Sequence, residues 1–352
     1  MLNFDHLHSH DTYMKRCLEL AELGSGNVAP NPMVGAVLVY EGRIIGEGYH
    51  RQYGQAHAEV NCINSVPAAL QHLIMKSTLY VSLEPCNHVG KTPPCSDLII
   101  HHKIPTVVIA CTDPFEKVNG TGIQKLKDAG VNVVTGILEK EAIYLNRRFF
   151  TFHKEQRPYI ILKWAQSNNR NIAHADFSPA KISNDITNRL VHKWRSEEAA
   201  IMVGTTTALH DDPSLTTRLW KGKNPVRVLI DKHLKLPANL HLFDNTIQTI
   251  IINTIKQEED GNNSFYQIGK SEDTIAVTLN ILRQRNLISL IVEGGATLLQ
   301  SFINANCWDE ARVITNKSLN IENGIAAPVL GDVPAFKKQQ LLTDEICFYS
   351  NR

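Results

Sequence analysis

Apolar side chains in the first half of the chain follow two alternating patterns. Short runs rich in β-branched and aromatic residues predict strands at 34–40, 43–49, 78–83, 106–111 and 131–135. Apolar residues spaced three or four positions apart predict helices at 12–23, 58–66, 96–102, 123–129 and 139–153. Because strands and helices alternate, this half of the chain is expected to form an α/β domain.

The alternation resumes after Arg157-Pro158, where a proline interrupts the helical pattern. Strands are predicted at 159–165, 199–203, 226–230, 247–252 and 289–292. Helices are predicted at 183–195, with Ser183 as the N-cap, and at 275–284, whereas the polar stretch 256–264 predicts a surface loop. A chain of 352 residues is long enough for two domains, and we place them at 1–153 and 154–352.

Composition and charge indicate which partners and which cellular compartment to expect. Lys and Arg number 36 against 35 Asp and Glu, so no broad positive field favours nucleic acid or an anionic membrane as a partner. The seven cysteines are dispersed, which argues against a disulfide scaffold and for a reducing compartment. No apolar run approaches the ~20 residues of a membrane span, and the first residues lack the apolar run of a secretion signal. We therefore expect a cytoplasmic protein.

Candidate metal ligands lie in three elements of the first domain. His57 and Glu59 stand at the start of a predicted helix, Cys86 follows a predicted strand, and Cys95 comes nine positions later. Zinc prefers His nitrogen and Cys sulfur, and a catalytic zinc keeps three protein ligands and one open position. The pattern predicts a zinc site made by His57, Cys86 and Cys95. Glu59 is then placed to move protons between water and a substrate.

The order His-x-Glu, then Pro-Cys, then Cys is the pattern of zinc-dependent nucleobase deaminases. The spacing departs from it, because eight residues separate Cys86 from Cys95 where two are usual. A purely structural zinc site and an RNA-directed deaminase stay open as alternatives. The three-ligand count argues against the first, and the balanced charge argues against the second.

Three segments carry a resemblance to a known family: 30–35 (PNPMVG), 54–60 (GQAHAEV) and 84–95 (EPCNHVGKTPPC). They resemble the pyrimidine deaminases of riboflavin biosynthesis, which are fused to a C-terminal reductase, so the resemblance covers the whole chain. It implies an N-terminal cytidine-deaminase-like three-layer α/β domain and a C-terminal dihydrofolate-reductase-like domain.

The resemblance also implies a substrate, a diaminopyrimidinone that carries a ribosylamino group and a 5′-phosphate. Its 2-amino group would be exchanged for oxygen. The residues implied to contact this substrate are Asn31 at the ring and His50, Lys91 and Asp113 at the sugar phosphate.

The second domain offers a weaker signal of its own. Gly294-Gly295 lies between a predicted strand and a helix, where a backbone can approach phosphate, but it lacks the spacing of a GxGxxG site. Segments 163–165, 203–218 and 292–295 resemble the family's reductase motifs, which implies reduction of the ribose to a ribityl chain by NADPH. Lys163 would then lie beside the reacting sugar together with Asp211. The implied NADPH contacts are Ala165, Thr207, Asp211, Gly295, Ala296, Thr297, Leu298 and Leu299, and the implied substrate contacts are Arg195, Leu215, Arg218 and Glu293.

Three departures from the family pattern lie near these motifs. Phe115-Glu116 stands where relatives have Asn-Pro, Asn169-Arg170 stands where they have Asp-Gly, and Lys181 replaces a tryptophan. Arginine in place of glycine restricts a positive φ. A deaminase with a weakened or non-catalytic reductase domain therefore stays open as an alternative, and so does a role for Arg170 and Lys181 at the 2′-phosphate of NADPH.

Two further expectations concern assembly and the N-terminus. We expect a homo-oligomer, a dimer or a tetramer, that acts on a small molecule and on neither nucleic acid nor membrane. His6, His8 and His10 alternate in a way that can bind metal, but an exposed N-terminal run is the simpler interpretation.

Overall fold

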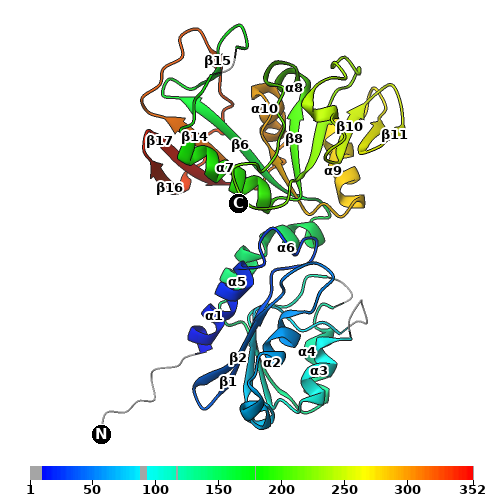
Figure 1. The fold of residues 1–352 in the computed structure, drawn as a ribbon, viewed down its shortest axis with the longest axis vertical. Coiled ribbons are helices and arrows are strands. Elements are labelled where there is room, and N and C mark those ends of the chain that lie inside the picture. Colours follow the sequence, from blue (N-terminus) through cyan, green and yellow to red (C-terminus); the bar gives the residue numbers. More distant parts are fainter. Residues whose placement is uncertain (1–9, 88–92, 116–117, 179, 352) are drawn as a thin grey trace. The chain divides into compact units, whose positions relative to one another are not determined.

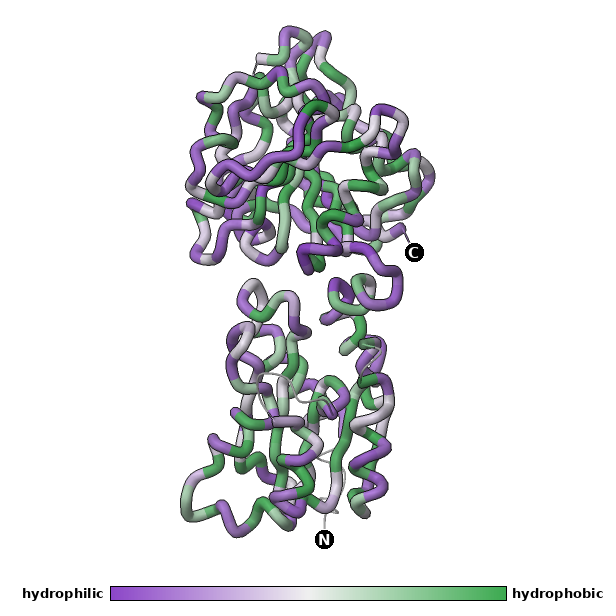
Figure 2. Tube along the Cα trace, turned by 90° about the vertical axis from the view of Figure 1, so that its right-hand side faces the viewer, coloured by the Kyte–Doolittle hydropathy of each residue, from purple (hydrophilic) through white to green (hydrophobic). Residues whose placement is uncertain are grey.

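The computed structural model describes residues 10–87, 93–115, 118–178 and 180–351. The chain divides into two compact units, Met1–Gln156 and Arg157–Arg352. Each unit has its own sheet and its own apolar clusters (Figure 1). In Figure 2, hydrophobic residues run through the interior of each unit and hydrophilic residues lie around its edges.

The first unit is built on a five-stranded sheet in the order β2-β1-β3-β4-β5. β1 pairs antiparallel with β2 and β3, whereas β3, β4 and β5 are parallel. The strands are β1 (Gly35–Tyr40), β2 (Arg43–Tyr49), β3 (Thr78–Val81), β4 (Thr106–Ile109) and β5 (Asn132–Thr135). The helices are α1 (His10–Glu22), α2 (Ala58–Asn64), α3 (Cys95–His101), α4 (Thr121–Asp128), α5 (Glu139–Leu145) and α6 (Arg147–Lys154), with a 3-10 helix at Ala68–Lys76.

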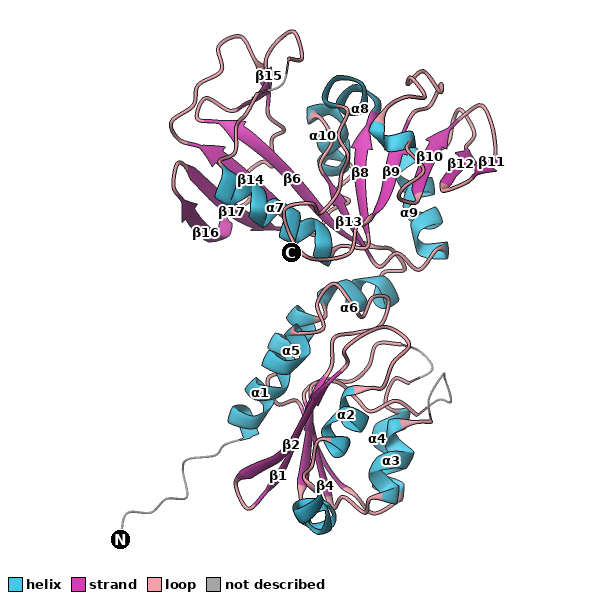
Figure 3. Cartoon of the chain, in the orientation of Figure 1, coloured by secondary structure: helices cyan, strands magenta, loops and turns pink. Residues whose placement is uncertain are grey.

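Alternate residues of the strands point to opposite faces of this sheet, and helices cover both faces. Val37 and Val39 of β1 pack in one apolar cluster with residues of α1, α5 and α6, whereas Ala36 and Leu38 pack in another with α2, α3 and α4. The result is three layers (Figure 3). α2 lies so close to the sheet that a Cβ on Gly48 would be 2.2 Å from the backbone nitrogen of Cys62.

The second unit is built on a ten-stranded sheet in the order β11-β12-β10-β9-β8-β13-β6-β14-β17-β16, with a separate pair β15-β7. The first strands are β6 (Tyr159–Ser167), β7 (Asn171–Ala173), β8 (Ala200–Gly204), β9 (Val226–Ile230), β10 (Thr249–Asn253) and β11 (Glu258–Asp260). The others are β12 (Asn263–Gln267), β13 (Ser289–Val292), β14 (Glu310–Asn316), β15 (Ile325–Ala326), β16 (Ala335–Leu341) and β17 (Asp344–Ser350). The helices are α7 (Asp185–Glu197), α8 (Thr205–Asp211), α9 (Thr274–Gln284) and α10 (Ala296–Asn304), with a 3-10 helix at His241–Phe243.

This sheet is also buried on both faces. Ile160 and Leu162 of β6 pack in the apolar cluster that contains residues of α9 and α10, whereas Tyr159 and Ile161 pack in the cluster that contains residues of α7 and α8. The central strands β10, β9, β8, β13, β6 and β14 are parallel. Parallel strands that helices cover on both faces are buried on both sides, so nearly all their residues are apolar. Such apolar runs are visible in the sequence, and these strands could therefore be predicted from it.

Three predictions about local structure were wrong in detail. The N-cap of α7 is Asn184 and not Ser183, because the Asn184 side chain accepts hydrogen bonds from the backbone nitrogens of Ile186 and Thr187. The stretch 256–264 is no plain loop, since β11 pairs antiparallel with β12 across a turn in which Gly261 has a φ of +60°. The predicted helix 139–153 is two helices, because Asn146 separates α5 from α6.

The turn after β6 contains Arg170 at a φ of +61°. Its backbone nitrogen donates to the carbonyl of Ser167 at 3.0 Å, and its carbonyl accepts from Ala327 at 2.9 Å, so the left-handed conformation is fixed on both sides. A non-glycine residue in this region costs roughly 1 kcal/mol. We therefore expect Arg170→Gly to raise the free energy of unfolding of the second unit by about 1 kcal/mol in urea denaturation.

The matched control for this prediction is Arg189→Gly, the same chemical change inside α7. Glycine within a helix costs about 1 kcal/mol, so this variant should shift stability in the opposite direction. A loss of stability in both variants would show that Arg170 makes contacts that outweigh its backbone strain.

Candidate active sites

A cluster of His57, Cys86 and Cys95 lies at one edge of the sheet in the first unit. His57 is the N-cap of α2, Cys95 is the first residue of α3, and Cys86 follows β3. The Nδ1 atom of His57 is 3.5 Å from the sulfur of Cys86 and 3.4 Å from that of Cys95. Among the described residues, this is the one group of His, Cys, Asp and Glu side chains arranged to hold a metal ion.

The spacing of these three side chains fits zinc. Bonds of about 2.0–2.1 Å to nitrogen and 2.3 Å to sulfur, at tetrahedral angles, place ligand atoms about 3.5 Å apart. Hydrogen bonds from the Cys95 side chain and from His57 lower the pKa of the Cys86 thiol to about 4, which favours the thiolate that a metal requires. The three residues therefore form a three-ligand zinc site.

Glu59 lies in the first turn of α2, two residues after His57, and its side chain is buried. Burial, together with the negative charge of Cys86, raises the pKa of this carboxyl group to about 7. A carboxyl group that gains and loses a proton near neutral pH is suited to proton transfer. Its place beside the metal ligands, but outside their set, is the one expected for a proton carrier.

Two of the predicted substrate contacts lie next to this cluster. The side-chain nitrogen of Asn31 is 3.2 Å from Nε2 of His50, and Nδ1 of His50 is 3.1 Å from the carbonyl of Ala56. The His50 and His57 rings meet edge to face with centroids 5.5 Å apart. Burial lowers the pKa of His50, so its neutral form is favoured and can exchange hydrogen bonds with a neutral ring.

The other two predicted substrate contacts are Asp113 and Lys91, and the structure describes the first of them alone. Asp113 is buried after β4, and its carboxylate accepts a hydrogen bond from the backbone nitrogen of Phe115 at 2.8 Å. Burial raises the pKa of Asp113 to about 7. Lys91 lies outside the described residues, and so do Glu116, His6 and His8. His10 is described, and its Nδ1 atom is 2.9 Å from the hydroxyl of Tyr80.

Glu84 has a structural role that its place in the segment 84–95 did not indicate. The buried Glu84 carboxylate accepts hydrogen bonds from four backbone nitrogens, at distances between 2.9 and 3.2 Å: those of Asp113, Gly120, Gly122 and Ile123. These hydrogen bonds hold the segment after β4, which contains Asp113, against the segment after β3, which contains Cys86. An acidic residue directly after a predicted buried strand was the available signal, because a buried carboxylate needs hydrogen-bond partners.

Asn146 is a second residue that sequence reasoning missed. Its side-chain oxygen accepts from the backbone nitrogen of Met33 at 2.8 Å, and its side-chain nitrogen donates to the Met33 carbonyl at 2.8 Å. Asn146 is buried, and Met33 lies two residues after Asn31. Asn146 lies at the break between α5 and α6. The break therefore places the Asn146 side-chain amide where its hydrogen bonds to Met33 fix the loop that carries Asn31.

We expect Asn146→Ala to raise the KM for the substrate of the first unit roughly tenfold while changing kcat less. The reason is that loss of two hydrogen bonds to Met33 frees the loop that positions Asn31, at a cost of about 1 kcal/mol for each bond. Steady-state kinetics with zinc analysis checks this. Asn132→Ala at the exposed start of β5 is the control and should leave KM unchanged. A loss of zinc in Asn146→Ala would instead indicate general unfolding.

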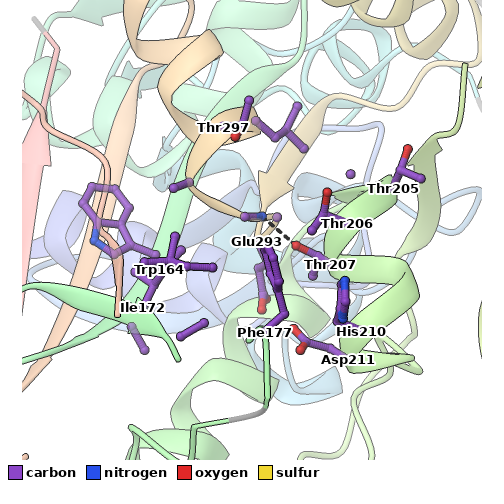
Figure 4. Close-up of a pocket in the computed structure, with 18 of the residues that line it drawn as sticks. Trp164, Ile172, Phe177, Thr205, Thr206, Thr207, His210, Asp211, Glu293 and Thr297 are labelled. Atoms are coloured by element: carbon purple, nitrogen blue, oxygen red, sulfur yellow. Dashed lines mark hydrogen bonds between the residues drawn. The ribbon is translucent and has the colours of Figure 1, made fainter. Parts of the chain in front are cut away.

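The second unit contains a cavity of about 920 Å³ at the carboxyl ends of its central strands (Figure 4). Helices α8 and α10 and the segment after β7 contribute to its walls. Many of the predicted site residues line it: Lys163, Ala165, Thr207, Asp211, Glu293, Gly295, Ala296, Thr297 and Leu298. The structure thus brings together residues that lie more than 130 positions apart in the sequence.

Four predicted contacts do not line this cavity. Leu215 and Leu299 are buried in the apolar clusters. Arg218 is exposed, with its guanidinium 3.3 Å from the hydroxyl of Thr216. Arg195 donates two hydrogen bonds to Glu293, which does line the cavity.

Arg195, Lys163 and Glu293 form a buried network of ion pairs at the wall of the cavity. Arg195 makes two hydrogen bonds to the Glu293 carboxylate, at 2.9 and 2.8 Å, and the Lys163 ammonium lies 3.3 Å from the same carboxylate. Burial by itself would raise the pKa of Glu293, but the charges of Arg195 and Lys163 outweigh it and lower the pKa to about 2. Burial lowers the pKa of Lys163, which eases release of its proton. Glu293 is the ion-pair partner of Lys163, and Asp211 lines the same cavity from the exposed end of α8.

The turn that follows Glu293 suits a phosphate group. α10 begins at Ala296 and points its N-terminus toward the turn Gly294-Gly295, whose backbone nitrogen at Gly295 donates to the Thr207 hydroxyl at 2.8 Å. A Cβ on Gly294 would lie 3.0 Å from the backbone nitrogen of Gly204, so the turn packs directly on β8. Helix N-termini with close-packed glycines accommodate phosphates. The residues present therefore fit a dinucleotide cofactor.

In the part of the chain that the structure describes, no helix is both long enough and apolar enough to cross a membrane.

Comparison with known proteins covers both units. Residues 7–111 match the cytidine and deoxycytidylate deaminase zinc-binding region, and residues 158–316 match the RibD C-terminal domain. The riboflavin biosynthesis protein RibD of Aquifex aeolicus is 37% identical over 302 residues, which cover 84% of each chain. RibD of Bacillus amyloliquefaciens is 38% identical over 307 residues, which cover 85% of this chain and 82% of that protein.

A solved structure gives the same result. The diaminohydroxyphosphoribosylaminopyrimidine deaminase/5-amino-6-(5-phosphoribosylamino)uracil reductase of Thermotoga maritima superimposes with a TM-score of 0.87 at 33% identity, covering 97% of this chain and 98% of that chain. The predicted cytidine-deaminase-like and dihydrofolate-reductase-like folds are thereby confirmed.

Proposed function

This chain belongs to the RibD family of riboflavin biosynthesis proteins, and from that premise we propose how its own residues perform the two reactions. The chain is an enzyme with a zinc-binding deaminase domain and a reductase domain. We assign the deaminase to residues 1–153 and the reductase to residues 154–352. The substrate is the diaminopyrimidinone ribosylamino phosphate that the name of the Thermotoga maritima protein describes.

In the deaminase, His57, Cys86 and Cys95 hold zinc. When bound, zinc supplies Lewis-acid activation of water near neutral pH. Glu59 carries the two protons of the attacking water in turn, the first to the ring nitrogen and the second to the departing amine, so that the C–N bond breaks, the 2-amino group leaves as ammonia and the oxygen stays on the carbon. The single observation that carries this assignment is the three-ligand cluster with the buried Glu59 beside it.

Binding of the deaminase substrate rests on residues that surround this cluster. Asn31 and His50 hydrogen-bond to the pyrimidine and its sugar, supported by the contact between their side chains. Asp113 and Lys91 hold the ribosyl phosphate. Glu84 and Asn146 position Asp113 and Asn31 respectively, through the backbone hydrogen bonds described above.

In the reductase, the sugar carbon that is bound to the amine loses its bond to the ring oxygen, and NADPH, when bound, would supply the hydride that replaces that bond. Lys163 gives a proton to the released ring oxygen, since burial lowers the pKa of this lysine, and Glu293 and Arg195 hold Lys163 in place. Thr207 and the turn Gly294-Gly295 receive the pyrophosphate of the cofactor. The intact Lys163–Glu293–Arg195 network supports an active reductase over the weakened one that the Asn169-Arg170 departure suggested.

The test of this function is a coupled assay on the purified, zinc-loaded chain with the diaminopyrimidinone ribosylamino phosphate. Release of ammonia, followed by NADPH oxidation with formation of a ribityl product, is the expected result. Ammonia without NADPH oxidation would contradict the reductase assignment, and no ammonia from folded, zinc-bound protein would contradict the substrate. Light scattering on the same sample tests our further proposal that the chain forms a homo-oligomer, a dimer or a tetramer.

Preference for NADPH over NADH is proposed to depend on Lys232. This exposed residue follows β9 and lines the cavity, together with Thr274 and Ile275 at the start of α9. An ammonium group attracts the 2′-phosphate that only NADPH carries. We expect Lys232→Ala to weaken NADPH binding about tenfold and to leave NADH binding unchanged, as measured by calorimetry.

Two other lysines bear on this prediction. Lys235→Ala is the control, because Lys235 is exposed on the same loop but does not line the cavity. Of the two residues suggested by the sequence, Lys181 lines the cavity and pairs with Asp185 at 3.2 Å, whereas Arg170 does not line it. Equal loss of NADPH and NADH binding in Lys232→Ala would exclude the role in preference.

A further inference from the structure

An aromatic pair stands in the reductase cavity and has no part in the reaction described above. The Phe177 ring stacks on the His210 imidazole with centroids 4.6 Å apart and an angle of 17° between the planes. Both residues line the cavity, and Figure 4 shows them on the side where Asp211 also lies. Phe177 remains 39% exposed, so one face of its ring rests on His210 while a large part of the side chain is open to the cavity.

The backbone of Phe177 adopts an energetically unfavourable conformation. Its φ is +62°, a left-handed conformation in which a bulky residue is an outlier. The backbone nitrogen of Phe177 donates to the carbonyl of His174 at 3.0 Å, and the next residue, Ser178, donates to the Asp176 carboxylate at 2.9 Å. Core packing does not account for this arrangement, because the ring belongs to neither apolar cluster of the unit. Strained residues that are held by their surroundings gather at ligand sites.

The position of the pair along α8 indicates which ring it would meet. His210 follows Thr207 by three residues, and Thr207 is bonded to the phosphate-suited turn at Gly295. Three residues of helix advance about 4.5 Å, which is close to the span of the ribose that joins a pyrophosphate to its base. Phe177 and His210 line the same cavity as Lys163 and Glu293, and all four belong to its wall (Figure 4). A ring that reaches the pair therefore lies in the cavity where the hydride is transferred.

We propose that Phe177 and His210 form a stacking subsite for the nicotinamide ring of the dinucleotide cofactor, an inference that rests on the proposed reductase function. A planar ring placed on the open face of Phe177 gains offset stacking. The oxidised nicotinamide carries a positive charge, which the face of a phenyl ring attracts. The subsite therefore orients the ring and favours the oxidised form of the cofactor.

The experiment measures binding by calorimetry on the full chain, with two ligands that differ only at the nicotinamide. NADP⁺ carries the ring, and 2′-phosphoadenosine 5′-diphosphoribose lacks it. The variants are Phe177→Gly, which keeps the left-handed turn without strain, and His210→Ala. Phe336→Ala is the control, since Phe336 is an exposed phenylalanine on β16 outside the cavity. Urea denaturation of the second unit reports that each variant is folded.

The expected result is that Phe177→Gly binds NADP⁺ roughly three- to tenfold more weakly, the range typical of an aromatic pair, and binds the ligand without nicotinamide as the unaltered chain does. His210→Ala should show a smaller loss in the same direction. An equal loss for both ligands, or no loss for NADP⁺, would overturn the subsite, and a rise confined to the KM of the pyrimidine would assign the ring to the substrate instead. If the unaltered chain binds neither ligand, the reductase function itself fails and the subsite with it.

Discussion

Replacing Glu59 with glutamine is expected to lower ammonia release by about 10²–10⁴-fold, while zinc remains bound at one ion per chain. Glutamine keeps the size of the side chain but cannot carry a proton. His57, Cys86 and Cys95 are unchanged, and so the three-ligand site persists. The measurement is ammonia release under saturating substrate, combined with zinc content by atomic emission.

The control for this prediction is Glu47→Gln, which removes a carboxylate from β2 that pairs at 2.7 Å with Arg16 on the surface. An exposed ion pair contributes 0–1 kcal/mol, so ammonia release should be unchanged. Activity in Glu59→Gln near that of the unaltered chain would mean that another group moves the proton. Loss of zinc in the same variant would mean that Glu59 takes part in holding the metal.

The second large effect is expected for Glu293→Gln, which should abolish reductase activity and lower the free energy of unfolding of the second unit by about 3 kcal/mol. Removing one partner of a buried ion network leaves Lys163 and Arg195 with uncompensated charge. Lys163 would then lose its proton more readily, and its position beside the substrate would no longer be fixed. Urea denaturation and NADPH oxidation measure the two effects separately.

The pH dependence of stability follows from the same carboxylate. The pKa of Glu293 is lowered in the folded state from its ordinary value of 4.5 to about 2. A lowered pKa contributes stability above the ordinary value, and that contribution is lost as pH falls from 4.5 toward 2. Glu293→Gln should therefore lack the part of acid destabilisation that lies in this window.

The matched control is Glu345→Gln, which breaks the partly exposed pair between Glu345 and Lys317. Its effect on stability should stay within about 1 kcal/mol. If Glu293→Gln were no less stable than this control, the network around Lys163 would contribute nothing to the fold, and its role would be confined to the reaction.

Local patterns in the sequence determined a large part of this protein. The zinc ligands were identified because each lies next to the start of a helix or the end of a strand. A few neighbouring residues are enough to predict where such an element begins or ends. The parallel strands were identified for a similar reason, since burial on both faces makes each strand an apolar run. Resemblance then supplied the family, which the comparisons confirm.

Only the tertiary structure decided how distant segments are held together. Glu84 bonds to nitrogens about 30 to 40 residues away, and Asn146 bonds to Met33 across more than 100 residues. Lys163 pairs with Glu293, a partner that the sequence did not indicate, because the parallel register of β6 and β13 brings those two strand ends together. The Phe177–His210 stack likewise depends on a turn and a helix that share no sequence pattern. Short-range periodicity fixes which elements form, whereas the partners of a buried charge or ring depend on strand order and register, which single-chain patterns do not encode.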